Sequence, residues 1–228
     1  MKILITSGGT TENIDSVRGI TNHSTGSLGK CIAEQFLAHG HEVTLVTTKS
    51  AIKPVPQEHL TLNIVSNVDS LLKTLEPLVK ENDVLIHSMA VSDYTPVYMA
   101  SLDEVEKLNN LSQLLSKKNE EPKISSKADH QVLFLEKTPK IITLVKQWNS
   151  DIKLIGFKLL VNVEKEKLFA VARDSLTKNQ ANYILANDLT EITSTQHHAY
   201  LIDQEHVYEA NTKAEIAQLI FEKVTEND

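Results

Sequence analysis

The sequence predicts a doubly wound α/β fold whose sheet is mainly parallel and carries an antiparallel hairpin addition. Short apolar runs rich in β-branched residues alternate with amphipathic helical segments over most of the chain. Each run is followed by a loop and lacks in-out alternation, which is typical of buried parallel strands. With 228 residues, 41% of them hydrophobic, the chain can bury one core. We therefore expect one Rossmann-like domain over residues 1–228.

The expected elements follow one another along the chain. Leu28, Ile32 and Phe36 repeat on one face of a first helix, for which Gly40 is a suitable C-terminal cap. Similar spacing predicts helices over 68–79, 141–148 and 168–176, and a capping box at 212–215 begins a last helix. The expected strands cover 2–6, 43–47, 61–65, 84–88, 132–135, 154–157 and 183–186. The hairpin consists of 199–202 and 206–209 around the turn 203–205.

The stretch over 98–127 interrupts this alternation. It has no strand pattern, and it contains one amphipathic helix candidate, over 102–115, followed by a charged run and a polar tail. An excursion of this length inside a compact domain is usually a lid, a binding loop or a disordered segment. We expect a flap or insertion at about 98–127.

Composition excludes several classes of protein. The net charge of -7 and the pI of about 5.7 argue against general binding to nucleic acids or anionic membranes. No apolar stretch approaches the ~20 residues of a membrane span, and the start is too short for a signal peptide. A single cysteine, Cys31, rules out a disulfide framework and a cysteine metal site. We expect a soluble, cytoplasmic protein.

The segment with the most candidate functional residues follows the first strand. Glycines and hydroxyl side chains recur in turns at 7–12 and 17–26, with Arg18 and Asn22 among them, and predict a site for an anionic ligand. It is not a P-loop, because Ser24 stands where the first glycine belongs and Cys31 where the Mg²⁺-binding hydroxyl belongs. It also lacks the G-x-G-x-x-G fingerprint, and no Tyr-x-x-x-Lys pair occurs in the chain.

Several segments, in order along nearly the whole chain, resemble the phosphopantothenoylcysteine synthetase (phosphopantothenate–cysteine ligase) family, in its stand-alone bacterial form. They include Ser7-Gly8-Gly9-Thr10-Thr11-Glu12, Val17-Arg18, Thr21-Asn22-His23-Ser24-Thr25-Gly26, Ala90-Val91-Ser92-Asp93-Tyr94, Lys137-Thr138-Pro139-Lys140-Ile141 and Ile155-Gly156-Phe157-Lys158-Leu159. The resemblance implies that a nucleoside triphosphate, CTP with Mg²⁺, activates 4′-phosphopantothenate and releases pyrophosphate. The amine of L-cysteine then attacks the acyl-cytidylate, which releases CMP.

The resemblance also implies roles for particular residues. Asn22 is the expected catalytic residue, and phosphopantothenate would be bound by Arg18, Asn22 and Ala90, the last from the partner subunit of a homodimer. The nucleotide would be bound by Gly8, Gly9, Thr10, Ser24, Thr25, Gly26, Asp93, Lys123, Thr138, Pro139, Lys140, Ile141, Phe157 and Lys178. Asp93 could hold the ribose or a metal, and the metal ligands stay unknown. A decarboxylase on a separate chain would act next.

Each of these roles has a structural alternative. Asn22 could shape the turn before a helix capped by Ser24 or Thr25, and Asp93 could form an Asx turn. Phe157 could pack in the core, and the lysines could be solvated. Two departures from the family pattern, at 125–126 and 160–161, keep open a nucleotide-sensing module without turnover. A nicotinamide-dependent reductase is a further alternative, which the fold favours and the missing fingerprint opposes.

Overall fold

The computed structural model describes residues 1–226, and most of them surround one sheet of eight strands. The strands β5-β4-β1-β6-β9-β10 run parallel in that spatial order, which is the 3-2-1-4-5-6 order of a doubly wound fold. Their bounds are β1 (Lys2–Ser7), β4 (Glu42–Thr48), β5 (Leu60–Val65), β6 (Val84–His87), β9 (Lys153–Leu160) and β10 (Tyr183–Asp188). The antiparallel hairpin of β11 (Ala199–Ile202) and β12 (Val207–Ala210) extends the sheet beyond β10. The predicted fold class is confirmed.

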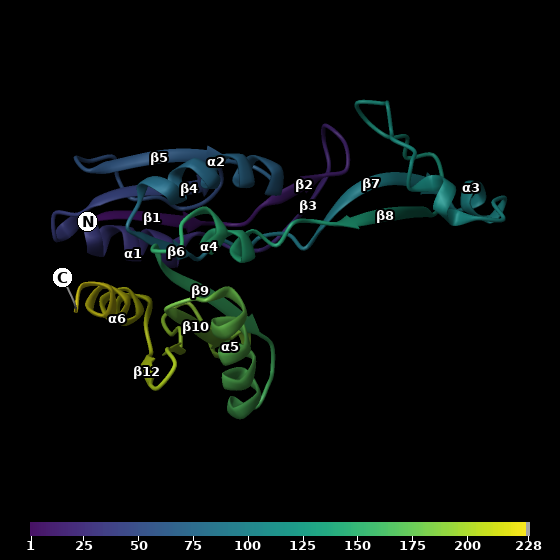
Figure 1. The fold of residues 1–228 in the computed structure, drawn as a ribbon. Coiled ribbons are helices and arrows are strands. Elements are labelled where there is room, and N and C mark those ends of the chain that lie inside the picture. Colours follow the sequence, from purple (N-terminus) through teal and green to yellow (C-terminus); the bar gives the residue numbers. More distant parts are fainter. Residues whose placement is uncertain (227–228) are drawn as a thin grey trace.

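Helices cover both faces of this sheet (Figure 1). On one face α1 (Ser27–Ala38) and α6 (Lys213–Thr225) pack together, and Phe36 meets Phe221 edge to face. On the other face lie α2 (Val68–Glu81), α4 (Val145–Trp148) and α5 (Lys165–Asn179), with the short 3-10 helices η2 (Ile141–Leu144) before α4 and η3 (Leu189–Glu191) after β10. The strands β1, β4, β6 and β10 are almost entirely buried because both of their faces meet helices.

Local sequence determines where these helices begin and end. At the end of α1, Gly40 adopts a φ of 77° and donates its N–H to the carbonyl of Leu37, while His41 donates to Phe36. These two bonds form a Schellman motif, as the glycine predicted. At the start of α6, Thr212 Oγ1 accepts from the N–H of Glu215, which is one half of the predicted capping box, while the Glu215 carboxylate accepts from the N–H of Asn211 and not from that of Thr212. In the described residues, no helix combines the length and apolar character of a membrane span.

An arm projects from the body of the molecule. It consists of residues 94–137, in which β7 (Tyr94–Ser101) and β8 (Gln131–Lys137) form an antiparallel ribbon outside the main sheet. Figure 1 shows α3 (Leu102–Glu106) at the far end of this ribbon, and η1 (Leu111–Leu114) follows it in the chain. A second small hairpin, β2 (Thr11–Asn13) and β3 (Gly19–Thr21), extends beside the base of the ribbon.

Three expectations from the sequence are corrected here. The strand expected over 132–135 is part of β8, but it pairs with β7 instead of joining the main sheet. The stretch after residue 98 begins as a strand, because 98–101 complete β7, and the helix expected over 102–115 ends at Glu106. The N-cap position of α1 is Gly26, with a φ of 77°, and Thr25, one of the two expected caps, lies just before it and accepts from the N–H of Ser27 at 3.3 Å.

Candidate active site

The site expected from the sequence lies where the order of the sheet reverses, at the carboxyl ends of β1 and β6. After β1 the chain continues beside the segment that follows β6: Ala90 donates its N–H to the carbonyl of Gly8 at 2.9 Å. Thr10 donates its N–H to the carbonyl of Ala90 at 3.0 Å. In open α/β sheets this switch point is the crevice in which ligands bind. The structure therefore brings the first glycine turn and Ala90 together.

Glycines allow the backbone to pack closely at this edge. Gly8 has a φ of 89°, and a Cβ there would lie 2.8 Å from both the Ala51 side chain and Thr48 Oγ1. A Cβ on Gly26 would lie 2.9 Å from the same alanine side chain, so residues 8, 26 and 51 lie side by side. Gly26 offers no capping side chain, so apart from the N–H of Ser27, which donates to Thr25 Oγ1 at 3.3 Å, the N–H groups of the first turn of α1 can serve an anion at this edge. We call these turns, at 8–10 and 24–29, the glycine cradle.

Asn22 lies against this cradle. Its N–H donates to the carbonyl of Thr10 at 3.3 Å, and its own carbonyl oxygen would be 2.2 Å from a Cβ on Gly9. The Asn22 side chain is half-buried. A neutral amide in this position can donate to an anionic oxygen without adding a charge of its own.

The segments that follow β6 and β8 form a second side of the site, next to the glycine cradle. Ser92 is buried, and its N–H and hydroxyl both bond to Thr10 Oγ1, at 2.9 and 3.0 Å. Thr138 donates its hydroxyl to the carbonyl of Ser92 at 2.5 Å and its N–H to the carbonyl of Asp93 at 3.0 Å. Lys140 Nζ lies 3.0 Å from Asp93 Oδ1, and both side chains are exposed. The predicted nucleotide residues 93, 138 and 140 are thus connected to Thr10 through Ser92.

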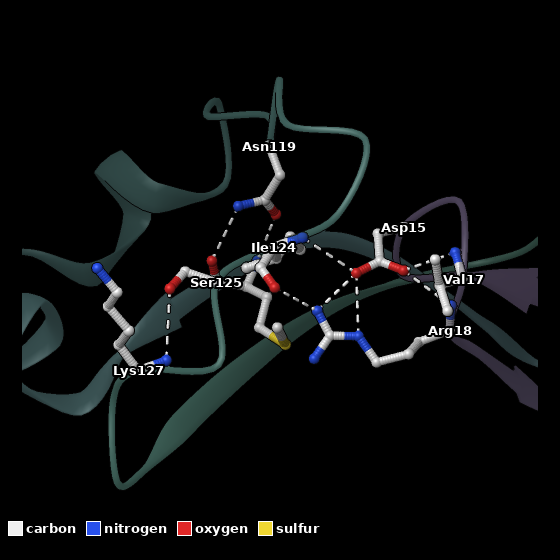
Figure 2. A network of polar contacts seen from close by, with 8 residues as sticks. Asp15, Val17, Arg18, Asn119, Ile124, Ser125 and Lys127 are labelled. Atoms are coloured by element: carbon white, nitrogen blue, oxygen red, sulfur yellow. Dashed lines mark hydrogen bonds and ion pairs between the residues drawn. The ribbon is translucent and has the colours of Figure 1, made fainter.

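Arg18 and Lys123 lie close to each other in the chain's fold, but beside the arm and not in the glycine cradle. Arg18 is in the turn between β2 and β3, at the opposite end of β3 from Asn22, and it bonds to Asp15 and to the carbonyl of Ile124 (Figure 2). Lys123 directly precedes Ile124 and is exposed. The arginine that the resemblance assigns to phosphate and the lysine that it assigns to the nucleotide are therefore adjacent through the backbone of residue 124.

Three further predicted residues differ in their position. Phe157 in β9 directly follows Gly156, which pairs with His87 at the end of β6, so it lies at the same carboxyl edge as the cradle while its side chain packs against the hydrophobic core beneath α1 and α6. Ile141 is buried in the core on the other face, so it can offer only backbone groups. Lys178 lies in the last turn of α5, a helix that returns the chain to the starting end of β10. A helix between parallel strands runs back across the sheet, and this places Lys178 at the edge opposite the cradle.

The sequence analysis missed two buried polar residues, Asp15 and Ser92. The spacing of Asp15 from Arg18 is a weak indication, because an aspartate often accepts from backbone N–H groups two and three residues ahead. The Ser92 contact to Thr10 joins residues 82 positions apart and has no local pattern. Within residues 1–226, no three His, Cys, Asp or Glu side chains are grouped to hold a metal ion.

Two adjacent histidines, His197 and His198, lie away from the cradle, and because the sequence offers them no spaced metal-binding partners, a structural role is expected of both. His197 is buried and bonds to Asn187 at 3.0 Å, and His198 bonds to Glu191 and Glu209. Burial lowers the pKa of His197 to about 4. A neutral buried ring and a doubly paired ring are consistent with the structural role expected of both.

Comparison with known proteins gives consistent matches. A family model described as DNA/pantothenate metabolism flavoprotein C-terminal domain matches residues 1–227. The solved DNA/pantothenate metabolism flavoprotein from Streptococcus pneumoniae is 55% identical, with a TM-score of 0.96 and coverage of 100% of both chains. The C-terminal domain of coenzyme A biosynthesis bifunctional protein CoaBC is 28% identical, with a TM-score of 0.74, covering 100% of this chain and 96% of that one.

A curated relative matches over nearly the same range. The coenzyme A biosynthesis bifunctional protein CoaBC of Thermococcus kodakarensis is 30% identical over 227 residues, which make up 98% of this chain and 50% of that protein. The chain thus spans about half the length of the curated relatives it matches first.

Proposed function

The chain belongs to the family of DNA/pantothenate metabolism flavoprotein C-terminal domains, and from this we propose that it is a phosphopantothenate–cysteine ligase of coenzyme A biosynthesis. One observation carries the proposal. The segments on which the sequence resemblance rests, 7–12, 21–26, 90–93 and 138–140, are far apart in the chain but meet at one edge of the sheet. The name of the curated relative, a coenzyme A biosynthesis protein, supports the same pathway.

The proposed reaction has two steps. The carboxylate of 4′-phosphopantothenate attacks the α-phosphate of the nucleotide, and pyrophosphate leaves. The amine of L-cysteine then attacks the acyl carbon, an amide forms, and the nucleoside monophosphate leaves with the bonding electrons. Two anions must meet in the first step, so the site has to neutralise and align them.

The residues fit these needs as follows. The glycine cradle and the N-terminus of α1 offer N–H groups to the phosphates, and Lys140 supplies a positive charge at the same edge. Asn22 donates to the anionic acyl-nucleotidyl intermediate. Arg18 binds the phosphate of phosphopantothenate, and Lys123 approaches the triphosphate from the arm. A nucleophilic side chain is not required.

Mg²⁺ is part of this proposal. Proteins that handle nucleotides commonly hold Mg²⁺ by one or two carboxylates together with the substrate phosphates. The exposed Asp93 beside Lys140 is a carboxylate of that kind, so these residues fit the ion without a protein cage. When bound, Mg²⁺ would neutralise charge on the phosphates.

We also propose a homodimer joined through the arm. A two-stranded ribbon is marginally stable in water by itself, and the arm leaves Tyr94, Leu115 and Leu135 exposed. Pairing with a second copy would cover this surface and bring the Ala90 segment of one subunit to its partner. Sedimentation at several concentrations tests this. A cytoplasmic location and a decarboxylase that acts next complete the proposal.

The function is tested by pyrophosphate release. Phosphopantothenate, L-cysteine and Mg²⁺ are incubated with CTP or with ATP, and we expect release that requires phosphopantothenate and is faster with CTP. Equal rates would refute the preference for CTP. Binding of CTP without any release would favour a nucleotide sensor, and hydride transfer from NADPH would favour a reductase.

A further inference from the structure

Asp15 lies at the centre of the contact between the β2–β3 turn and the arm (Figure 2). Its side chain is only 1% exposed. Its Oδ1 accepts from the N–H groups of Val17 and Arg18, each at 2.8 Å. Its Oδ2 accepts from Arg18 Nε at 3.0 Å, from Arg18 Nη2 at 2.5 Å, and from the N–H of Ile124 at 3.2 Å. One oxygen therefore shapes the turn, while the other joins the arginine to the arm.

The arm segment is held at more than one point. Arg18 Nη2 also donates to the carbonyl of Ile124 at 2.8 Å, and the N–H of Ser16 donates to the carbonyl of Pro122 at 2.9 Å. The Asn119 amide pairs with both backbone groups of Met99 in β7, at 2.8 and 3.0 Å. We call residues 119–127 the flap segment. Its position is thus defined by β7 at one end and by the β2–β3 turn at the other.

The charges favour this arrangement. The Arg18 guanidinium holds the pKa of the Asp15 carboxyl well below its usual range, so the carboxylate stays ionised at neutral pH. The Arg18 side chain is 38% exposed, and its Nη1 has no protein partner in the part of the chain that the structure describes. One side of the guanidinium is fixed by Asp15, and the other is open to an anion.

We propose that Asp15 is a positioning residue that couples the grip of Arg18 on the substrate phosphate to the placement of Lys123 over the nucleotide. Both backbone groups of Ile124 are tied to the Asp15–Arg18 pair, and Lys123 is its neighbour in the chain. A shift of the guanidinium would therefore shift the flap segment. This preorganises the binding of both anions at once. The roles of Arg18 and Lys123 in this coupling rest on the proposed function.

The variant Asp15→Asn isolates the coupling. An asparagine can keep its carbonyl oxygen on the turn, so the bonds to the N–H groups of Val17 and Arg18 persist. Its NH₂ group then faces three N–H donors in place of Oδ2, and those bonds are lost. Glu121→Gln is the matched control, because it removes one negative charge from an exposed side chain of the same segment.

The first readout is independent of activity. The intact protein is treated briefly with trypsin, and the initial rate of cleavage after Lys123 is compared with that after Lys178 in α5. We expect Asp15→Asn to raise the ratio of these rates about tenfold, because local opening of the flap segment becomes more frequent. Wild type and Glu121→Gln should give equal ratios. An unchanged ratio in Asp15→Asn overturns the proposal.

The second readout is kinetic. In Asp15→Asn the KM values for phosphopantothenate and for CTP should both rise about tenfold, whereas the KM for cysteine should stay the same. The double variant with Arg18→Gln should be no worse than Arg18→Gln alone, because both changes cut one coupling. A rise in KM for phosphopantothenate alone would contradict the coupling. So would a loss in the double variant that equals the sum of the losses in the two single variants. If wild type releases no pyrophosphate, the proposed function fails, and the proteolysis still decides the link between Asp15 and the flap segment.

Discussion

At the scale of single residues, the side chain of Asn22 is the one on which the proposed chemistry depends most. Asn22→Asp keeps the side-chain volume and the backbone bond to Thr10 but places an anion beside an anionic intermediate. We expect phosphopantothenate and CTP to bind, while amide formation falls by about a hundredfold or more. Calorimetry and product formation separate the two effects. Asn13→Asp, the same change at an exposed position of β2, is the control, and full activity of Asn22→Asp would remove Asn22 from the mechanism.

Residues of the site were predictable to the extent that a local motif carries them. The glycine cradle, Ala90 and Asp93 follow strands, and strand ends meet at one edge in a doubly wound sheet. Asp15 was not predictable as a link to the flap segment, because its partner Ile124 is 109 positions away. The resemblance also grouped Lys178 with the cradle, although the return of α5 across the sheet separates them in this chain.

At the scale of elements, the close approach of the β1 turn to the segment around Asn22 makes a clear test. A Cβ on Gly9 would lie 2.2 Å from the Asn22 carbonyl oxygen, so Gly9→Ala has to push Asn22 away. We expect kcat/KM to fall by tenfold or more, together with a loss of stability, because the clashing atom belongs to the backbone. Gly40→Ala is the control: its φ of 77° is strained for alanine at a cost of about 1 kcal/mol, but nothing lies within 4 Å. It should lower Tm and leave kcat/KM unchanged, and the opposite pattern would refute the steric argument.

The main-sheet strands were predictable because burial on both faces gives continuous apolar runs. In the arm, β8 was predicted from its apolar run at 132–135, but β7 was not, for a physical reason. β7 pairs only with β8, so its side chains are mostly half-buried and give neither an apolar run nor a clear alternation. Pro96 within β7 further weakens the strand pattern, and a register shift accommodates it. A strand outside the main sheet that pairs with one neighbour, such as β7, buries too few side chains to give a recognisable strand pattern in the sequence.

At the scale of the whole molecule, the buried His87, at the end of β6 next to β1, makes the global stability depend on pH. His87 accepts or donates one bond, to Thr6 Oγ1 at 2.8 Å, and burial lowers its pKa to about 4. An unfolded chain would protonate this ring at about pH 6.5, whereas the folded protein resists protonation down to about pH 4. The stabilising effect of neutral His87 is thus complete above about pH 6.5 and is lost as the pH falls toward 4.

We therefore expect the free energy of unfolding to fall by about 2 kcal/mol between about pH 8 and about pH 5 through His87 alone. Urea titrations across this range measure it. His87→Gln removes the titrating group, so its slope with pH should be shallower by that amount, and the remaining slope should include His197, whose pKa burial also lowers to about 4. His130→Gln, at an exposed position of the arm, should keep the wild-type slope. Equal slopes in His87→Gln and wild type would show that burial does not keep this ring neutral in the folded protein.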